Sequence, residues 1–405
     1  MISKSSSLAL TRRVPGLRRG VSKIRSKIKF NNFSGRNLLN RNVTLVHSLR
    51  NKNYFSFAKE RYSQKSGALG KSAAIEINNS CNINCVMCDT QSSTRPKRLM
   101  DLSLFNDTVV QLKQAGIETV TLHTIGDPLA NARLPQILSI LRKNRLPIGY
   151  ISTNGLLIHK HLDSLIEYND IVSNVRFSID GATKDTYEKI RVGGNWEDLI
   201  DNLNLAQKEL IPKGFEFYFD FVITRENFSE MGEFFSMFRK YTFSPYNINF
   251  HFMNSLAPSN SYFLLNNVLP EHTHPNYYCN FVAAMNPYIL VDGQISVCCR
   301  DYDGSLVIGS INSNQGIEKA NNSLRMGELR SATTQSSINK DNFPLCNTCF
   351  VVDSRVSEIW SNAIHYIKIR KPTEGGRYYQ SAFEALFECI KNDKLEGYEE
   401  FIESL

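Results

Sequence analysis

The pattern of apolar and polar positions becomes regular at about residue 73. From there, short runs rich in β-branched residues alternate with longer segments whose apolar residues recur every three or four positions. The first pattern is typical of buried strands and the second of amphipathic helices. We expect strands at 73–78, 119–124, 147–152, 175–179, 216–223 and 247–252, and helices at 102–114, 134–143, 160–167, 184–190, 195–209 and 228–241.

Six strands that alternate with helices predict a parallel sheet with right-handed crossover connections. The pattern is consistent with an open doubly wound sheet and with a partial barrel. In both arrangements the loops that follow the strands meet at the carboxyl edge of the sheet, where ligands bind. We therefore expect the functional residues in these loops.

After about residue 258 this regular alternation ends. Short predicted strands at 288–291 and 294–298 flank Asp292 and Gly293, a pair typical of a hairpin turn. A Ser/Asn-rich stretch follows at 310–342, and helical patterns at 356–368 and 378–395 end the chain. The predicted domains are a poorly ordered basic leader at 1–60, an α/β domain at 70–255, a small domain at 270–352 and a helical tail at 353–405.

Composition supports a folded protein, since 42% of the 405 residues are hydrophobic. The net charge of +8 is unevenly distributed, because residues 1–59 contain fourteen Lys or Arg and no Asp or Glu. The remainder has 47 − 14 = 33 basic and 39 acidic residues, a net charge of −6. This argues against a nucleic-acid-binding protein overall. The basic segment itself fits a transit peptide, an anionic-membrane contact, a nucleic-acid arm or a solubilising leader.

The nine cysteines are clustered rather than scattered. The sequence shows no apolar run long enough to span a membrane and no secretory signal at its start. Metal or cofactor ligation in a reducing compartment is therefore favoured over disulfides. The predicted location is the cytoplasm, or an organelle matrix if the basic segment is a transit peptide.

The densest cluster is the sequence CNINCVMC, in which Cys81, Cys85 and Cys88 directly follow the first predicted strand. Three thiolates in one loop can bind a single metal centre. A structural zinc site takes four ligands, whereas a [4Fe–4S] cluster held by three cysteines keeps one iron open for another ligand. A zinc loop completed by a distant residue is the alternative.

CNINCVMC resembles the signature of radical S-adenosylmethionine (radical SAM) enzymes, and motifs after the next strands resemble that family in the same order. TIGDPLAN at 124–131 resembles the turn whose backbone holds the methionine amino group, with Ile125 and Asp127 in place of the usual Gly and Glu. ISTNG at 151–155 and FSIDGATKDTYEKIRVGG at 177–194 resemble the ribose- and carboxylate-contacting segments. The implied cofactor contacts are Gly126, Asp127, Ser152, Asn154, Ser178, Asp180 and Arg191.

The second group of cysteines resembles the auxiliary-cluster extension of these enzymes, called SPASM in its full form and twitch in its shorter form. The resemblance implies one auxiliary [4Fe–4S] cluster, and a four-thiolate zinc site is the alternative. Asp301 is a candidate catalytic proton acceptor, with a solvated turn carboxylate as the other interpretation. The implied auxiliary ligands are Cys279, Cys298, Cys346 and Cys349.

Three other residues are less informative on sequence alone. Cys299 is either an alternative ligand or a small hairpin residue, and Cys389 has the helical spacing of a core thiol. His123 fits either core packing or substrate contact. The pair His272 and His274 fits a polar loop better than a metal site.

The resemblance implies an α/β fold, a partial (β/α)6 TIM-like barrel followed by a small auxiliary-cluster domain with a β-hairpin and a helix, and then a helical tail. It also implies cleavage of S-adenosylmethionine at a cluster held by Cys81, Cys85 and Cys88, which yields a 5′-deoxyadenosyl radical that removes a substrate hydrogen. A low-potential ferredoxin or flavodoxin would supply the electron.

Three functions remain open from the sequence. The first is net oxidation of a small molecule such as a sugar or cyclitol derivative, and the second is modification of a peptide or protein by a maturase. The third is a non-catalytic metal-binding protein. Residues 1–72 are weakly patterned and do not resemble the peptide-binding winged helix expected ahead of the barrel of a maturase, which favours the first function.

Overall fold

The computed structural model describes residues 67–253, 262, 279–334, 341–347, 360, 363, 364, 367 and 375–391. All of them belong to one compact unit, Tyr54–Leu405. The basic leader, most of the predicted helix at 356–368, the pair His272 and His274, and Cys349 lie outside the described residues.

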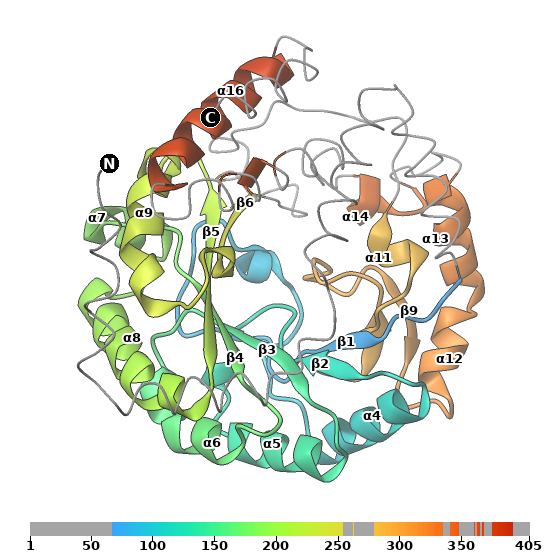
Figure 1. Ribbon diagram of the computed structural model, residues 1–405. Helices are drawn as coiled ribbons and strands as arrows, with labels where there is room; N and C mark the ends of the chain where they lie inside the picture. The colour runs from blue at the N-terminus through green and yellow to red at the C-terminus, as the bar shows by residue number, and fades with distance from the viewer. Residues whose placement is uncertain are drawn as a thin grey trace, which may run out of the picture. The chain divides into compact units, whose positions relative to one another are not determined.

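Six parallel strands form the first part of the sheet, each hydrogen-bonded to the next one in the sequence (Figure 1). Helices follow these strands along the chain and lie on the outside of the curved sheet, so the fold is a partial barrel rather than an open doubly wound sheet. The strands are β1 (Ser72–Ile75), β2 (Thr119–Thr121), β3 (Ile148–Thr153), β4 (Asn174–Ser178), β5 (Glu216–Ile223) and β6 (Ile248–Phe252). The helices are α4 (Leu102–Gln114), α5 (Leu134–Lys143), α6 (Leu162–Glu167), α7 (Lys184–Ile190), α8 (Trp196–Leu210) and α9 (Met231–Phe238).

Local signals explain where these helices begin. The side chains of Asp101, Thr183 and Asn195 accept hydrogen bonds from backbone N–H groups in the first turns of α4, α7 and α8. Short 3₁₀ helices extend or link the elements at Asp89–Ser92, Pro128–Ala130, Ile158–Lys160, Ile211–Lys213, Phe228–Glu230, Arg239–Tyr241 and Pro245–Asn247.

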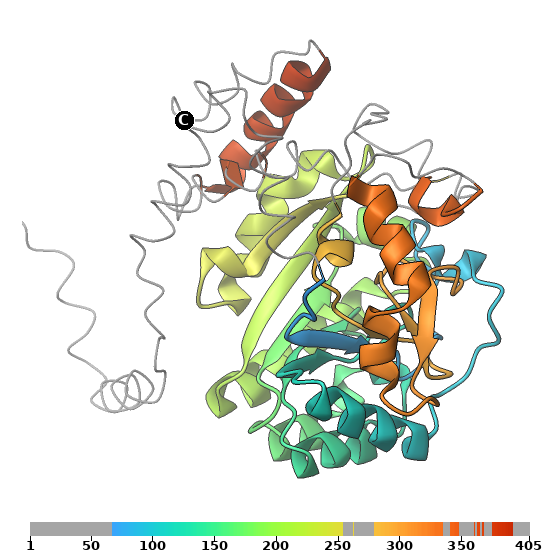
Figure 2. The same ribbon diagram turned by 90° about the vertical axis from the view of Figure 1, so that its right-hand side faces the viewer.

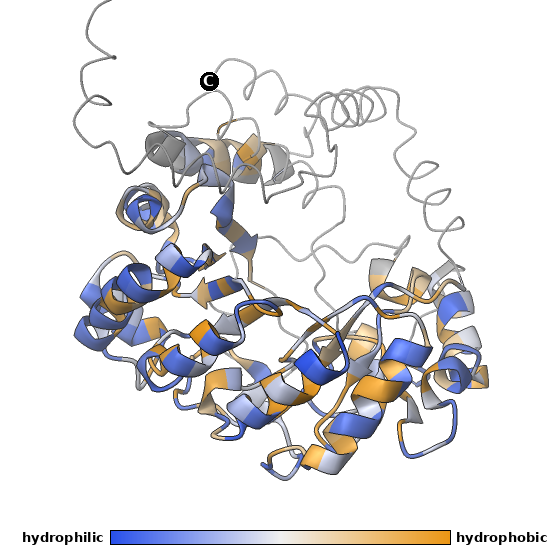
Figure 3. Ribbon diagram, turned by 60° about the horizontal axis from the view of Figure 1, so that its bottom comes forward, coloured by the Kyte–Doolittle hydropathy of each residue, from blue (hydrophilic) through white to orange (hydrophobic). Residues whose placement is uncertain are grey.

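Along the helices the hydropathy colouring alternates between hydrophobic and hydrophilic residues (Figure 3), and in α4 the buried residues are Phe105, Thr108, Val109 and Leu112. In β5 the burial alternates, so that Phe217, Phe219 and Phe221 are fully buried while the residues between them are only half-buried. Phe219 stacks on Phe238 of α9 with ring centroids 5.1 Å apart. The apolar face of the sheet therefore meets the helices, and a more polar face lines the inside of the barrel.

The predicted hairpin extends this same sheet instead of forming a separate layer. Strand β7 (Tyr288–Ile289) pairs in parallel with β1, and β8 (Gln294–Ser296) and β9 (Val307–Ser310) follow in antiparallel order. Figure 2 shows these segments beside β1. Further helices are α11 (Asn280–Ala283), α12 (Gly316–Asn321), α13 (Leu324–Thr334) and α14 (Pro344–Asn347), of which α12 and α13 lie in the stretch that the sequence marked only as rich in Ser and Asn.

The last described helix, α16 (Gly375–Lys391), covers α9 and the edge strand β6. The fully buried Tyr379 lies with its ring 4.8 Å from that of Phe250 and 5.1 Å from that of Phe235. This helix corresponds to the one predicted at 378–395 and contains Cys389. Within the described part of the chain, every helix is too short or too polar to cross a membrane.

Candidate functional site: a cysteine-lined cavity at the carboxyl ends of the strands

The three clustered cysteines lie in the loop that follows β1. Cys85 is buried, Cys81 is half-buried and Cys88 is exposed, and all three are free thiols. The loop is fixed by backbone hydrogen bonds to the end of α7, from Asn84 N to Val192 O (2.8 Å) and from Val86 N to Ile190 O (3.0 Å). The segment that follows β4 therefore holds the cysteine loop in place through its backbone carbonyl groups.

These thiols form one wall of a cavity of about 320 Å³. Residues at the strand ends that are predicted to contact the cofactor line the same cavity. Six of the seven predicted cofactor contacts line this cavity: Gly126, Asp127, Ser152, Asn154, Ser178 and Arg191. Ser80, His123 and Thr153 line it as well and were not predicted as cofactor contacts.

Gly126 brings the loop after β2 against the cysteine loop. Its φ is +83°, and a Cβ atom there would lie 2.5 Å from the carbonyl oxygen of Ser80. The next residue, Asp127, donates its backbone N–H to the same oxygen at 3.1 Å. Only glycine fits this position, because both the conformation and the close approach exclude a side chain.

The carboxylate of Asp127 is hydrogen-bonded to other groups of the chain. It is 3% exposed and accepts hydrogen bonds from Leu129 N (2.9 Å), from the Thr153 hydroxyl (2.9 Å) and from Asn154 N (2.7 Å). Burial raises the pKa of Asp127 above its ordinary value, while these hydrogen bonds oppose the shift. Asp127 thus joins the end of β2 to the end of β3. The amide of Asn154 then reaches the cysteine loop, donating to Asn82 Oδ1 at 2.9 Å.

Arg191 is buried beside Cys85. Its Nη1 donates to the Cys85 sulfur at 3.4 Å and its Nη2 pairs with Asp180, a fully buried residue with a positive φ. The third nitrogen, Nε, is buried without a hydrogen-bond partner. Burial raises the pKa of Cys85 to about 12, and Arg191 opposes this rise. Arg191, which the sequence predicts as a cofactor contact, thus pairs with a carboxylate of this chain, that of Asp180.

The donor set of the cavity fits the iron–sulfur cluster and S-adenosylmethionine. Soft thiolate ligands bind iron–sulfur clusters, and ligation removes the proton from a thiol whose pKa burial has raised. Arg191 provides a buried positive charge beside Cys85, with one donor still unused. The backbone of Gly126 lines the same cavity, beside the cysteine loop against which it packs.

Three of the four predicted auxiliary ligands, Cys279, Cys298 and Cys346, lie among the described residues. Cys298 follows β8, and Cys279 precedes α11 close enough to influence the titration of Cys298. A hydrogen bond from Cys298 lowers the pKa of Cys299, and the pKa of Cys298 rises in turn. Cys346 is half-buried in α14. In the part of the chain that the structure describes, no three His, Cys, Asp or Glu side chains are grouped closely enough to hold a single metal ion.

Asp301 is buried, at 2% exposure, and is not a solvated turn carboxylate. It accepts hydrogen bonds from the hydroxyl of Ser296 (2.6 Å), from Ser305 N (2.8 Å) and from Leu306 N (2.9 Å). Asp301 therefore stabilises the turn between β8 and β9. Proton transfer by Asp301 stays a prediction from the sequence.

Comparisons with known proteins identify the class. Residues 75–238 match the family model of the Radical SAM superfamily, and residues 279–350 match that of SPASM, an iron–sulfur cluster-binding domain. The chain is therefore a radical SAM enzyme with a SPASM domain after its barrel. These domains imply a [4Fe–4S] cluster that binds S-adenosylmethionine, S-adenosylmethionine itself and an auxiliary cluster.

Individual relatives are distant. The chain is 27% identical over 154 residues to the GTP 3′,8-cyclase of Synechocystis sp., which is 38% of this chain and 45% of that protein. It is 23% identical over 167 residues to the mycofactocin maturase MftC of Mycolicibacterium smegmatis, 41% of each chain. The chain thus spans less than half the length of these curated relatives. The solved structure of anSMEcpe with bound AdoMet and a peptide shares the fold, with 14% identity, a TM-score of 0.50, and coverage of 82% of this chain and 99% of that one.

Proposed function

We propose that this protein is a radical SAM oxidoreductase that oxidises a small, uncharged molecule with several hydroxyl groups, such as a sugar or cyclitol derivative. The observation that carries the proposal is the polar inner face of the barrel beside the cysteine-lined cavity. In this proposal Cys81, Cys85 and Cys88 hold the catalytic cluster. Cys279, Cys298, Cys346 and Cys349 hold the auxiliary cluster.

When bound, the cluster and S-adenosylmethionine supply hydrogen-atom abstraction from a carbon that acid–base chemistry does not activate. Arg191 then offsets the negative charge of the Cys85 thiolate. Gly126 presents its backbone to the cavity, and Ser152, Asn154 and Ser178 offer polar side chains to the cofactor there. Asp127 and Asp180 position other residues: Asp127 accepts a hydrogen bond from Asn154 N, and Asp180 forms an ion pair with Arg191.

The pairing of residues on adjacent strands shows which side chains of the barrel interior lie next to the cavity. Ser152 and Ser178 line the cavity. Arg176 is the partner of Ser152 on the neighbouring strand, and Asp220 is the partner of Ser178. Because partners in register on a parallel sheet point to the same face, Arg176 and Asp220 lie on the inner face directly beside the cavity walls.

These inner side chains form a balanced polar set. The guanidinium carbon of Arg176 lies 4.3 Å from the ring centroid of Tyr150, and its Nε lies 3.6 Å from Asp220 Oδ2. Asp220 also accepts a hydrogen bond from Asn249 at 3.0 Å. Burial lowers the pKa of the nearby His123 to about 4, so this imidazole is neutral at pH 7.

The charges of Arg176 and Asp220 therefore compensate one another, and many donors and acceptors remain beside an aromatic ring. Such planar polar side chains can satisfy neighbouring hydroxyl groups in both directions. A strongly anionic substrate would have to compete with Asp220 for Arg176. This arrangement supports a neutral polyol as substrate.

The proposed net reaction is a two-electron oxidation, such as alcohol to ketone. One hydrogen atom would end in 5′-deoxyadenosine, the remaining proton would pass to solvent, and the second iron–sulfur domain would supply the acceptor for the remaining electron. A low-potential ferredoxin or flavodoxin is the proposed electron donor. We also propose a reducing compartment, in keeping with free thiols at Cys81, Cys85 and Cys88.

The test is turnover by the anaerobically reconstituted enzyme on matched panels of neutral sugars and cyclitols, sugar acids and phosphates, and peptides. We expect 5′-deoxyadenosine formation coupled to loss of two hydrogens from a neutral polyol. Substituting Ala for Cys81, Cys85 and Cys88 together should abolish the cleavage while the second cluster's signal persists. Asp220→Asn should weaken substrate binding and leave substrate-free cleavage unchanged. Turnover of peptides alone would contradict the proposal.

A peptide-modifying maturase is the second candidate function. It is supported by the similarity to the mycofactocin maturase over 167 residues. This candidate predicts coupled 5′-deoxyadenosine formation in the peptide panel and none with the sugars.

A further inference from the structure

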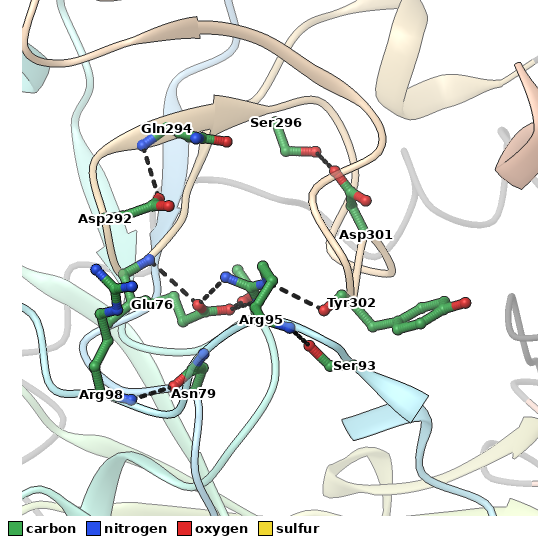
Figure 4. Close-up of polar contacts among 12 residues, drawn as sticks. Glu76, Asn79, Ser93, Arg95, Arg98, Asp292, Gln294, Ser296, Asp301 and Tyr302 are labelled. Atoms are coloured by element: carbon green, nitrogen blue, oxygen red, sulfur yellow. Dashed lines mark hydrogen bonds and ion pairs between the residues drawn. The ribbon is translucent and has the colours of Figure 1, made fainter. Parts of the chain in front are cut away.

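One buried carboxylate connects the segments that surround both cysteine sites (Figure 4). Glu76 directly follows β1, lies five residues before Cys81 and is fully buried. Its Oε1 accepts hydrogen bonds from Arg95 Nη1 (2.7 Å) and from the backbone N–H of Val291 (3.2 Å). Its Oε2 accepts from Arg95 Nη2 (2.9 Å) and from the hydroxyl of Thr124.

Arg95 completes the connection from the other side. It belongs to a strap at residues 93–98 that continues from the cysteine loop, and its side chain is only 11% exposed. Its Nε donates to the carbonyl oxygen of Tyr302 at 3.1 Å. Next to it, Thr94 donates its backbone N–H to Asp303 at 2.6 Å. Both contacts are made to the turn that follows Cys298 and Cys299.

The two ends of the strap are therefore tied to different cysteine groups. On one side Asn79, two residues before Cys81, donates to Pro96 O (3.0 Å) and accepts from Arg98 N (2.8 Å). On the other side Arg95 and Thr94 hold the turn that Asp301 braces from within. Glu76 itself also donates its backbone N–H to Ile289 O of β7 at 2.8 Å.

Burial makes this connection sensitive to change. A bidentate Arg–carboxylate pair has a fixed planar geometry, and removing one partner leaves an uncompensated buried charge. Outside their own pair, Arg95 donates to Tyr302 O and Glu76 accepts from Val291 N, so both side chains reach the segment that carries Cys298. A structural core contact of this kind could be apolar, whereas an ion pair fixes both distance and direction.

We propose that Glu76 and Arg95 are positioning residues, whose ion pair fixes the loop of Cys81, Cys85 and Cys88 relative to the hairpin that carries Cys298. A displacement at either cysteine site is then transmitted to the other through the strap. This role is independent of the substrate and would hold for a sugar oxidase and for a peptide maturase.

Amide hydrogen exchange and magnetic resonance of the full-length protein test this role. Arg95→Met removes the pair, and Arg95→Lys keeps the charge but loses the bidentate geometry. Thr94→Val removes only the exposed hydrogen bond from the Thr94 hydroxyl to Asp303 (3.0 Å) and keeps the backbone one. In Arg95→Met we expect residues 82–88 and 288–306 to exchange at least about tenfold faster together, while α5 exchanges as in the wild type. Arg95→Lys should give an intermediate result.

In the reconstituted protein, the magnetic interaction between the two reduced clusters, measured by electron paramagnetic resonance, should change in the same order. Arg142→Met is the matched control, because it removes the exposed pair Arg142–Asp170, which lies on α5 and the loop after α6. Faster exchange confined to 93–98, uniform faster exchange throughout, or an unchanged magnetic interaction would overturn the proposal. If Arg95→Met does not fold, Arg95→Lys and Thr94→Val decide it by the same two measurements.

Discussion

At the scale of single residues, close approach between backbones shapes the cavity as much as side-chain chemistry does. Gly126 places the loop after β2 against Ser80, whose carbonyl oxygen also accepts hydrogen bonds from Asp127 N and from the amide of Asn78 at 2.8 Å. A movement of a few tenths of an ångström there would shift the residue that immediately precedes Cys81. Backbone packing at one glycine therefore bears on the geometry of the cysteine loop.

Gly126→Ala tests this dependence. Both the positive φ and the 2.5 Å approach to Ser80 O must be relieved, so the loop has to move. Gly116→Ala is the control, because Gly116 has a similar φ of +79° but no atom within 4 Å of its Cβ position. We expect the control to lose about 1 kcal/mol of unfolding free energy in urea and keep its iron content. Gly126→Ala should lose more and bind less iron at the catalytic site, and equal losses in the two variants would contradict the argument.

For the acidic residues near the motifs, the sequence predicts the position but not the hydrogen-bond partners. Asp127, Asp180 and Asp301 all stand next to motif residues, and each was assigned to cofactor or proton chemistry. In the structure each carboxylate accepts hydrogen bonds from groups of the chain, for example from Val222 N to Asp180 at 2.6 Å, and the cofactor and proton roles stay predictions. The motif predicted the place of these residues. Their partners come from other strands and turns, which a linear pattern does not reveal.

At the scale of elements, the sequence predicted the barrel well because its signals are local. Three helices, Leu102–Gln114, Leu134–Lys143 and Lys184–Ile190, have the predicted bounds, and β5 does too. β9, α12 and α13 were missed, since β9 has only two adjacent apolar residues and the two helices carry little apolar periodicity. The pairing of β7 with β1 was missed for a different reason. It joins residues far apart in the chain and has no local signature.

The docking of α16 gives a prediction at this scale. Tyr379 is fully buried between Phe235 of α9 and Phe250 of β6, so Tyr379→Ala removes a large part of the contact and leaves a cavity. We expect a loss of about 3 kcal/mol in unfolding free energy, with faster amide exchange centred on α16. Phe243→Ala is the control, because Phe243 is 65% exposed, and it should change stability by less than about 0.5 kcal/mol. A loss in the control as large as that in Tyr379→Ala would argue against this role for the helix.

At the scale of the whole molecule, charge and chemistry are separated along the chain. The residues that line the cavity lie between Ser80 and Arg191, and the matched SPASM domain covers 279–350. The fourteen basic residues of 1–59 therefore lie outside every segment to which we assign chemistry. The positive net charge of the chain comes from this basic segment, and the remaining residues have a net charge of −6.

Removing residues 1–59 tests that separation. The net charge should change from +8 to 8 − 14 = −6, so the truncated protein should leave a cation-exchange column that retains the full chain at pH 7. Because no cavity residue is removed, reconstituted truncated protein should form 5′-deoxyadenosine at the rate of the full chain. Full-length protein with the basic residues of 1–59 changed to Gln serves as the control, since it loses the charge and keeps the length. Loss of cleavage in both forms would assign a catalytic role to the positive charge, and loss in the truncated form alone would assign it to the segment itself.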